Sequence, residues 1–233
     1  MPSCRVIIVA GGTGTIGSAV CSALVKREKR VIAICRHIPV VDVEFRDKLD
    51  FYVQDLKQDH AITCFLEFIR DNKYEIEGLV VSLSGNNSLN DRMIFGQLEM
   101  EIGLVEAIVP RMNTGAVVMM SSTAARLPFA TGFSRFYSGV KGYVESYVKV
   151  ASEEFGPKIR INAVAPGIVH SCKNTGTIHS RFKSDRIPMR RMGNTEEVAN
   201  AVVWTLLDAN YMTGQTLTID GGLTATIPLN VLE

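Results

Sequence analysis

The sequence predicts an α/β fold with a doubly wound, mostly parallel, seven-stranded sheet and helices on both faces. Short apolar runs alternate with longer segments of helical periodicity, as expected for right-handed strand–helix–strand units. Runs such as Val-Ile-Ile-Val and Ala-Val-Val-Met-Met are continuously apolar, as strands covered on both faces require. A length of 233 residues fits one domain, so we expect residues 1–233 to form a single unit.

The first half of the chain begins with a β-rich run, Arg5–Ala10, and then a periodic segment, Thr15–Arg30, that predicts a helix. Two short apolar runs, Val31–Cys35 and Asp50–Val53, predict the second and third strands. The segment His60–Asn72 is predicted as a helix because its apolar side chains form one stripe. That stripe consists of Ile62, Phe65, Leu66 and Ile69.

The second half repeats the alternation with four further apolar runs and three further periodic segments. The predicted strands are Leu79–Leu83, Ala116–Met120, Arg160–Val164 and Thr216–Ile219. The predicted helices are Gly96–Met112, Phe136–Phe155 and Glu196–Leu207. In such a sheet, ligands bind at the carboxyl ends of the strands, so the turns that follow the strands are where we expect the site.

Composition excludes several functional classes. A formal net charge of +1 offers no global attraction for nucleic acid. No apolar run approaches the ~18 residues of a membrane span, and the strand-like start leaves no room for a signal peptide. The five cysteines are scattered without a C-x-x-C spacing, so we expect reduced thiols, a cytoplasmic protein and no metal site. We expect Cys4, Cys21 and Cys64 to be buried as small apolar side chains.

A glycine-rich turn follows the first strand. Gly11, Gly14 and Gly17 precede the first helical pattern, and Thr13 adds a hydroxyl. Glycine lets the backbone approach a pyrophosphate closely, and the helix N-terminus favours its charge. The motif therefore predicts a dinucleotide site, with a plain tight turn as the alternative.

The end of the second strand bears on the choice of cofactor. An acid there typically binds the ribose 2′-hydroxyl of NAD, whereas an arginine accommodates the 2′-phosphate of NADP. Here the run ends Cys35-Arg36-His37 without an acid. The sequence favours NADP(H) over NAD(H), with Arg36 as the phosphate partner; an exposed arginine without a ligand is the alternative.

Tyr137 and Lys141 stand four residues apart, which places them on one face of a helix. A free phenol ionises with a pKa of about 10, and a neighbouring ammonium stabilises the phenolate. Such a phenol can donate a proton to a developing alkoxide or accept one from an alcohol. The alternative is an ordinary amphipathic helix surface.

Taken together, these motifs resemble the short-chain dehydrogenase/reductase family over essentially the whole chain, most closely its compact classical branch with the 3-oxoacyl-carrier-protein reductases. The resemblance is carried by Gly11–Gly17, Asp55-Leu56, Tyr137–Lys141, Asn162-Ala-Val-Ala-Pro166-Gly167, Gly193-Asn-Thr-Glu-Glu-Val-Ala199, Tyr211-Met-Thr-Gly214-Gln and Asp220-Gly221-Gly222. It implies a Rossmann-like fold and hydride transfer between a nicotinamide and a carbonyl or alcohol carbon.

The resemblance also implies residue roles. Tyr137 is the acid/base, Lys141 tunes it and bonds the nicotinamide ribose, and Ser122 bonds the substrate carbonyl, with Ser121 or Thr123 as alternatives. Gln97 stands where a catalytic Asn normally holds a relay water. The implied cofactor contacts are Gly11, Thr13, Gly14, Ile16, Gly17, Arg36, Asp55, Leu56, Ser84, Gly85, Tyr137, Lys141, Pro166, Gly167 and Val169.

Several features depart from the family pattern, among them the G-x-x-G-x-x-G spacing, Ala10 in place of the usual Thr, the sequence Ser82–Gly85 after the fourth strand, and Gln97. They leave open a degenerate member that binds nucleotide without efficient catalysis. An NAD(P)+-dependent secondary-alcohol dehydrogenase is the other alternative to a ketone reductase.

Residues 168–190 are expected to form a substrate lid. Its basic excess suggests an anionic partner such as a carrier-protein or coenzyme A thioester, with a solvated loop as the alternative. The family often assembles through the helices at Gly96–Met112 and Phe136–Phe155, so we expect a homodimer or homotetramer.

Overall fold

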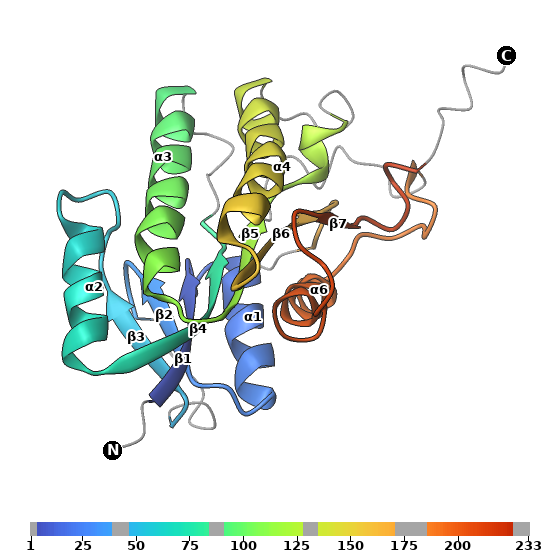
Figure 1. The fold of residues 1–233 in the computed structure, drawn as a ribbon. Coiled ribbons are helices and arrows are strands. Elements are labelled where there is room, and N and C mark those ends of the chain that lie inside the picture. The colour runs from blue at the N-terminus through green and yellow to red at the C-terminus, as the bar shows by residue number, and fades with distance from the viewer. Residues whose placement is uncertain (1–3, 39–46, 84–90, 128–134, 171–185, 226–233) are drawn as a thin grey trace, which may run out of the picture.

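In the computed structural model, which describes residues 4–38, 47–83, 91–127, 135–170 and 186–225, seven parallel strands form one sheet (Figure 1). The strands are β1 Cys4–Ala10, β2 Val31–Cys35, β3 Leu49–Val53, β4 Tyr74–Val81, β5 Gly115–Met120, β6 Ile159–Pro166 and β7 Thr216–Ile219. Their spatial order is β3-β2-β1-β4-β5-β6-β7, and each neighbouring pair is parallel. The predicted α/β class is confirmed.

Helices cover both faces of this sheet. They are α1 Thr15–Lys26, α2 Ala61–Asp71, α3 Asp91–Ile108, α4 Arg135–Phe155 and α6 Thr195–Leu207, with the short 3-10 turns η2 Val109–Arg111 and η3 Thr123–Ala125. Alternate side chains of β1 point to opposite faces of the sheet. Val6 and Ile8 pack with α2, α3 and α4, whereas Ile7 and Val9 pack with α1 and α6. Each face is therefore apolar along the whole strand, which explains the continuous apolar runs.

The order of the strands reverses between β1 and β4. From β1 the chain continues to β2 and β3 on one side, and it then returns to β4 on the other side. The ends of the two strands are tied where Ser82 N–H donates a 2.9 Å hydrogen bond to the carbonyl oxygen of Ala10. Such a reversal leaves a crevice at the carboxyl ends of the strands, where open α/β sheets bind ligands.

Element boundaries differ from the predictions where local chemistry interrupts a pattern. The first helix ends at Lys26 rather than Arg30, because Glu28 takes a left-handed conformation with φ of 61°. The helix predicted to run to Met112 ends at Ile108 and continues as η2, where Pro110 cannot donate a backbone hydrogen bond. The fourth strand begins earlier than predicted, at Tyr74, because it pairs with the full length of β1.

The thiols only partly follow expectation. Cys21 is buried in the α1 layer, and burial raises the pKa of its thiol to about 12, so it is unreactive. The prediction for Cys64 was wrong: it is exposed, because α2 turns Phe65 and Ile69 inward instead. Cys4 is half-buried.

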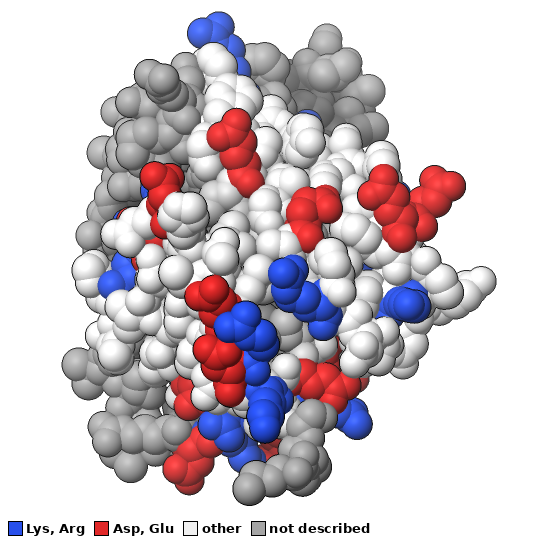
Figure 2. Space-filling model, turned by 60° about the vertical axis from the view of Figure 1, so that its left-hand side comes forward, with Lys and Arg blue, Asp and Glu red and all other residues white. Residues whose placement is uncertain are grey.

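Charges are mixed across the surface. Figure 2 shows basic and acidic side chains interspersed on the face it draws, in keeping with a net charge of +1. Among the residues that the structure describes, none of the helices has the length and apolar character needed to cross a bilayer.

Candidate active site

The glycine turn lies at the point where the strand order reverses. Gly11 has φ of 81°, and a Cβ atom there would lie 2.4 Å from the carbonyl oxygen of Ser82. A Cβ on Gly17 would lie 2.2 Å from the carbonyl oxygen of Gly11, which also accepts a hydrogen bond from Gly14 N–H at 2.9 Å. These close backbone approaches require glycine, because a methyl group would have to displace backbone atoms.

Helix α1 begins directly after this turn. Gly14 precedes the helix and has no side chain to cap it, and the first turn of α1 contains no acidic residue. The helix dipole at this end favours a negatively charged group. Backbone amides at a glycine-lined helix start are the donors that a pyrophosphate needs, so this turn fits a dinucleotide.

Arg36 follows β2 at the same edge of the sheet. Its side chain is exposed, and within the described part of the chain it forms no ion pair. An arginine in this place has the charge and the donor geometry to bind a phosphate.

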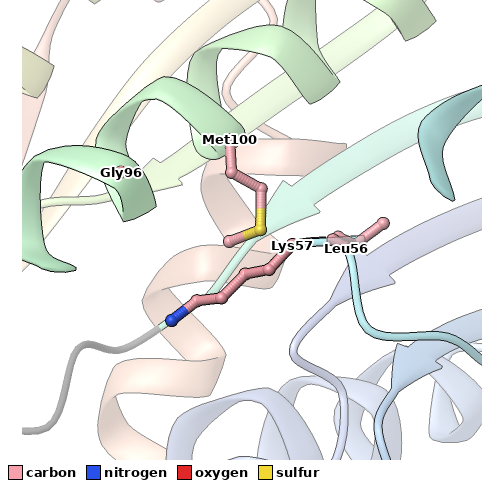
Figure 3. Close-up of a pocket in the computed structure, with 4 residues that line it drawn as sticks. All are labelled: Leu56, Lys57, Gly96 and Met100. Carbon is pink, nitrogen blue, oxygen red and sulfur yellow. The ribbon is translucent and has the colours of Figure 1, made fainter. Parts of the chain in front are cut away.

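A groove of about 440 Å³ lies beyond the turn after β3 (Figure 3). It is lined by Leu56, Lys57, Gly96 and Met100, and Figure 3 shows Met100 pointing from α3 toward Lys57. Asp55 shapes its rim, because one carboxylate oxygen accepts a hydrogen bond from the backbone N–H of Lys57 at 3.1 Å. The predicted adenine contacts Asp55 and Leu56 thus lie on the turn that borders an apolar groove.

Tyr137 and Lys141 lie one turn apart on α4. Lys141 is only 4% exposed, and its Nζ atom is 6.0 Å from the centre of the Tyr137 ring. The ammonium donates a 2.9 Å hydrogen bond to the carbonyl oxygen of Met120, the last residue of β5. The structure therefore brings the phenol ring and a buried cation together at the carboxyl end of the sheet.

A third group, which the sequence analysis did not identify, completes this arrangement. Glu101 of α3 is 2% exposed, and its Oε2 atom is 3.8 Å from Lys141 Nζ. Gln97, one turn earlier, donates a 3.0 Å hydrogen bond to Glu101 Oε1 and another bond to the carbonyl oxygen of Leu83. A small recess is lined by Ile94, Gln97, Glu101, Tyr137, Val140 and Lys141.

The signal for Glu101 was present in the sequence. The buried positions of α3 recur at three- and four-residue spacing, and Glu101 occupies one of them. The other buried members are Ile94, Gln97, Leu98, Leu104, Val105 and Ile108, and all of them except Gln97 are apolar. An acid on an apolar stripe is expensive to bury unless it is paired. Burial raises the pKa of the Glu101 carboxyl, and the charge of Lys141 opposes that rise.

Three hydroxyls follow β5. Ser122 Oγ accepts a 3.2 Å hydrogen bond from Ala124 N–H and so caps η3. Ser121 Oγ lies 3.1 Å from both the Lys141 carbonyl oxygen and Glu145 Oε1. Thr123, within η3, is buried. The turn η3 packs against α4, which places all three hydroxyls next to the helix of Tyr137.

The end of β6 forms the opposite side of the crevice. After Pro166, Gly167 N–H donates a 2.8 Å hydrogen bond to the carbonyl oxygen of Ile219, and a Cβ on Gly167 would lie 2.8 Å from Asp220 Cα. Val169 forms an isolated parallel bridge with Gly193. The predicted nicotinamide wall is therefore held by backbone bonds to β7 and to the residues before α6.

Several predicted positions lie outside the described residues. They are Ser84, Gly85 and residues 171–185 of the expected lid.

Known proteins resemble this chain along its length. The family model described as "Enoyl-(Acyl carrier protein) reductase" matches residues 12–224. The 3-oxoacyl-[acyl-carrier-protein] reductase of Bos taurus is 27% identical over 96% of this chain and 99% of its own length. The 1-cyclohexenylcarbonyl-CoA reductase of Streptomyces collinus is 26% identical over 96% of this chain and 88% of its own. A short chain dehydrogenase family protein of Francisella tularensis shares the fold, with a TM-score of 0.76, 24% identity and coverage of 95% of this chain and 99% of that one.

Proposed function

The chain belongs to the short-chain dehydrogenase/reductase family, and from this premise we propose that it reduces a ketone to a secondary alcohol with NADP(H). The observation that carries the proposal is the buried Lys141 ammonium beside the Tyr137 ring at the carboxyl end of the sheet. A protein that only binds nucleotide could use the cation for the ribose, but it would not need a proton-donating phenol beside it.

The cofactor is proposed to lie along the crevice between β1 and β4. The amides of Ile16 and Gly17 in the first turn of α1 would hold its pyrophosphate, and Arg36 would pair with the 2′-phosphate. Asp55 and Leu56 would border the adenine, and Pro166, Gly167 and Val169 the nicotinamide. When bound, the reduced nicotinamide supplies the hydride that the carbonyl carbon receives.

The protein's own residues then transfer a proton to the carbonyl oxygen. Ser122 donates a hydrogen bond to the carbonyl oxygen and orients it. Tyr137 transfers its phenol proton to that oxygen as negative charge develops there. Lys141 stabilises the resulting phenolate, because its ammonium is held next to the ring by the Met120 carbonyl. In the reverse direction the same groups take a proton from an alcohol, so an NAD(P)+-dependent alcohol dehydrogenase is the second candidate.

An acyl thioester is the proposed substrate class. Two relatives that match this chain over most of their own length are named for thioester substrates, one bound to a carrier protein and one to coenzyme A. The proposed lid, residues 168–190, has a basic excess that would attract the phosphate of either carrier.

An NADPH-oxidation screen over acyl thioesters, cyclic ketones and quinones tests this function, run with the wild type and with Tyr137→Phe. We expect turnover of a 3-oxoacyl thioester, and a loss of about 10²–10⁴-fold in Tyr137→Phe with NADPH binding retained. Tyr143→Phe is the matched control, because Tyr143 lies on the same helix and is 52% exposed. Equal turnover by the two variants would remove Tyr137 as the proton donor, whereas no turnover of any substrate by the wild type would leave only a nucleotide-binding protein.

The proposal includes a homodimer or homotetramer. The exposed apolar side chains Tyr143 and Val150 on α4 support it, since they lie on a helix expected to meet a second copy. Light scattering measures the state directly, and a monomeric mass would refute this part.

A further inference from the structure

Two oppositely charged side chains, Glu101 and Lys141, face each other where α3 packs against α4. Glu101 interrupts the mainly apolar stripe of α3. Lys141 lies in the buried stripe of α4, which continues with Val144, Val148 and Ala151. The two helices lie side by side on one face of the sheet (Figure 1). The pair is therefore placed beside a layer that is mainly apolar.

Stability alone does not account for this pair. Removing two charges from water costs several kcal/mol per ion, and well-packed apolar side chains often stabilise as much or more. Leucine or methionine on both stripes would match the neighbouring positions. The buried Glu101–Lys141 pair therefore points to a role that depends on charge rather than on stability.

The contacts of Lys141 indicate what this role is. Its Nζ atom contacts the Met120 carbonyl at 2.9 Å and the Glu101 carboxylate at 3.8 Å. The carbonyl fixes the position of the ammonium but carries no net charge. Among the residues that the structure describes, Glu101 is the one acid within ion-pair distance of this ammonium, and it supplies the counter-charge that a buried cation needs. Gln97 in turn orients that carboxylate and anchors it to the Leu83 carbonyl.

We propose that Glu101 is a positioning residue of the active site, which keeps Lys141 charged and directed at Tyr137 before cofactor or substrate arrives. The proposal rests on the proposed function and adds to it a residue on α3. It also assigns Gln97 a purpose: its amide holds Glu101 in the orientation that Lys141 requires. The site is thereby assembled from three elements, α3, α4 and the end of β5.

Loss of Glu101 should change the pH at which the phenol of Tyr137 ionises, in a direction that can be stated in advance. Without Glu101, the buried ammonium is unpaired and loses its proton more readily, so less positive charge remains to stabilise the phenolate. The tyrosine would then ionise at higher pH. A direct effect of Glu101 on the phenol has the opposite sign, because removing a negative charge would favour the phenolate. Among the described residues around this recess, Lys141 and Tyr137 from α4 are the ionisable side chains that face Glu101.

Ultraviolet difference titration of tyrosinate in the cofactor-free protein measures this. The signal of Tyr137 is the component lost in Tyr137→Phe. The variants are Glu101→Gln, Lys141→Met, their combination, and Glu99→Gln as a control with the same chemical change at an exposed position of α3. We expect Glu101→Gln to move the midpoint upward by about one unit or more, Glu99→Gln to leave it in place, and Glu101→Gln to add nothing in the Lys141→Met background.

A downward or absent shift in Glu101→Gln, or an equal shift with and without Lys141, would overturn the proposal. If Glu101→Gln does not fold but the combined variant does, the unpaired ammonium is the cause, and the counter-charge role is supported. If neither folds, Glu101 holds the structure through Gln97 alone, and the proposal fails. The readout needs neither NADPH nor turnover, so its failure is separate from failure of the reductase assignment.

Discussion

The Ser121 hydroxyl lies 3.1 Å from the carbonyl oxygen of Lys141, so the strand end at β5 is tied to the helix that carries the proposed catalytic pair. The Ser121 hydroxyl also lies 3.1 Å from a carboxylate oxygen of Glu145. Within the described part of the chain, the hydroxyl of the next residue, Ser122, accepts a hydrogen bond from Ala124 N–H and has no acceptor for its own proton. We therefore expect Ser122, rather than Ser121, to donate to the carbonyl of the proposed substrate.

Ser122→Ala is expected to lower kcat by about 10²-fold, because one donor to the developing oxyanion is lost. Ser121→Ala, the matched control, should instead lower the free energy of unfolding by about 1 kcal/mol with a smaller change in kcat. Steady-state kinetics and urea unfolding of both variants measure this. A larger loss of kcat in Ser121→Ala would assign the substrate hydroxyl to Ser121.

Arg36→Gln is expected to raise the KM for NADPH by about 10- to 100-fold and to leave the KM for NADH nearly unchanged, since a charged bond to the 2′-phosphate is lost. Fluorescence titration with both cofactors checks the change in binding. Lys26→Gln is the control, because Lys26 is also exposed and basic but lies in the last turn of α1. Tighter binding of NADH than NADPH by the wild type would refute the cofactor assignment.

Gly17→Ala is expected to abolish cofactor binding and to destabilise the protein by about 1–3 kcal/mol, because its Cβ would lie 2.2 Å from the Gly11 carbonyl oxygen. Gly142→Ala makes the same chemical change within α4, where a Cβ meets nothing within 4 Å. It should stabilise the protein by roughly 0.5–1 kcal/mol. Denaturant unfolding and cofactor titration of the two variants give the comparison. Normal binding by Gly17→Ala would show that the turn is not a nucleotide cradle.

The start of α6 predicts a pH dependence. Arg191 and the backbone N–H of Asn194 bind Glu197 and lower the pKa of its carboxyl to about 2. Because the folded value is below the ordinary 4.5, the stabilisation is fully present above pH 4.5 and is lost as the pH falls toward 2. Glu197→Gln should therefore unfold more easily than the wild type at neutral pH, and the difference should vanish near pH 2. Thermal unfolding across this range tests it, with the exposed neighbour variant Glu196→Gln expected to show a weaker dependence.

The sequence alone determined what depends on near neighbours in the chain. Continuous apolar runs indicated strands covered on both faces, and the four-residue spacing of Tyr137 and Lys141 placed them on one face of a helix, because the period of a helix is constant. The close approach of Gly17 to Gly11 was likewise implicit in a glycine turn before a helix.

Which distant groups meet depends on how the layers pack, and this could not be read from the sequence. Asn162 was noted as part of a motif, but the structure shows it fully buried, bonded to the Met212 carbonyl and to Gln215 N–H. Glu101 and Lys141 lie on different helices with β5 between them in the chain, and their pairing follows from how α3 and α4 pack on the sheet. Periodicity states which face of each helix is buried, but the partner across that face is set by the packing of the whole layer.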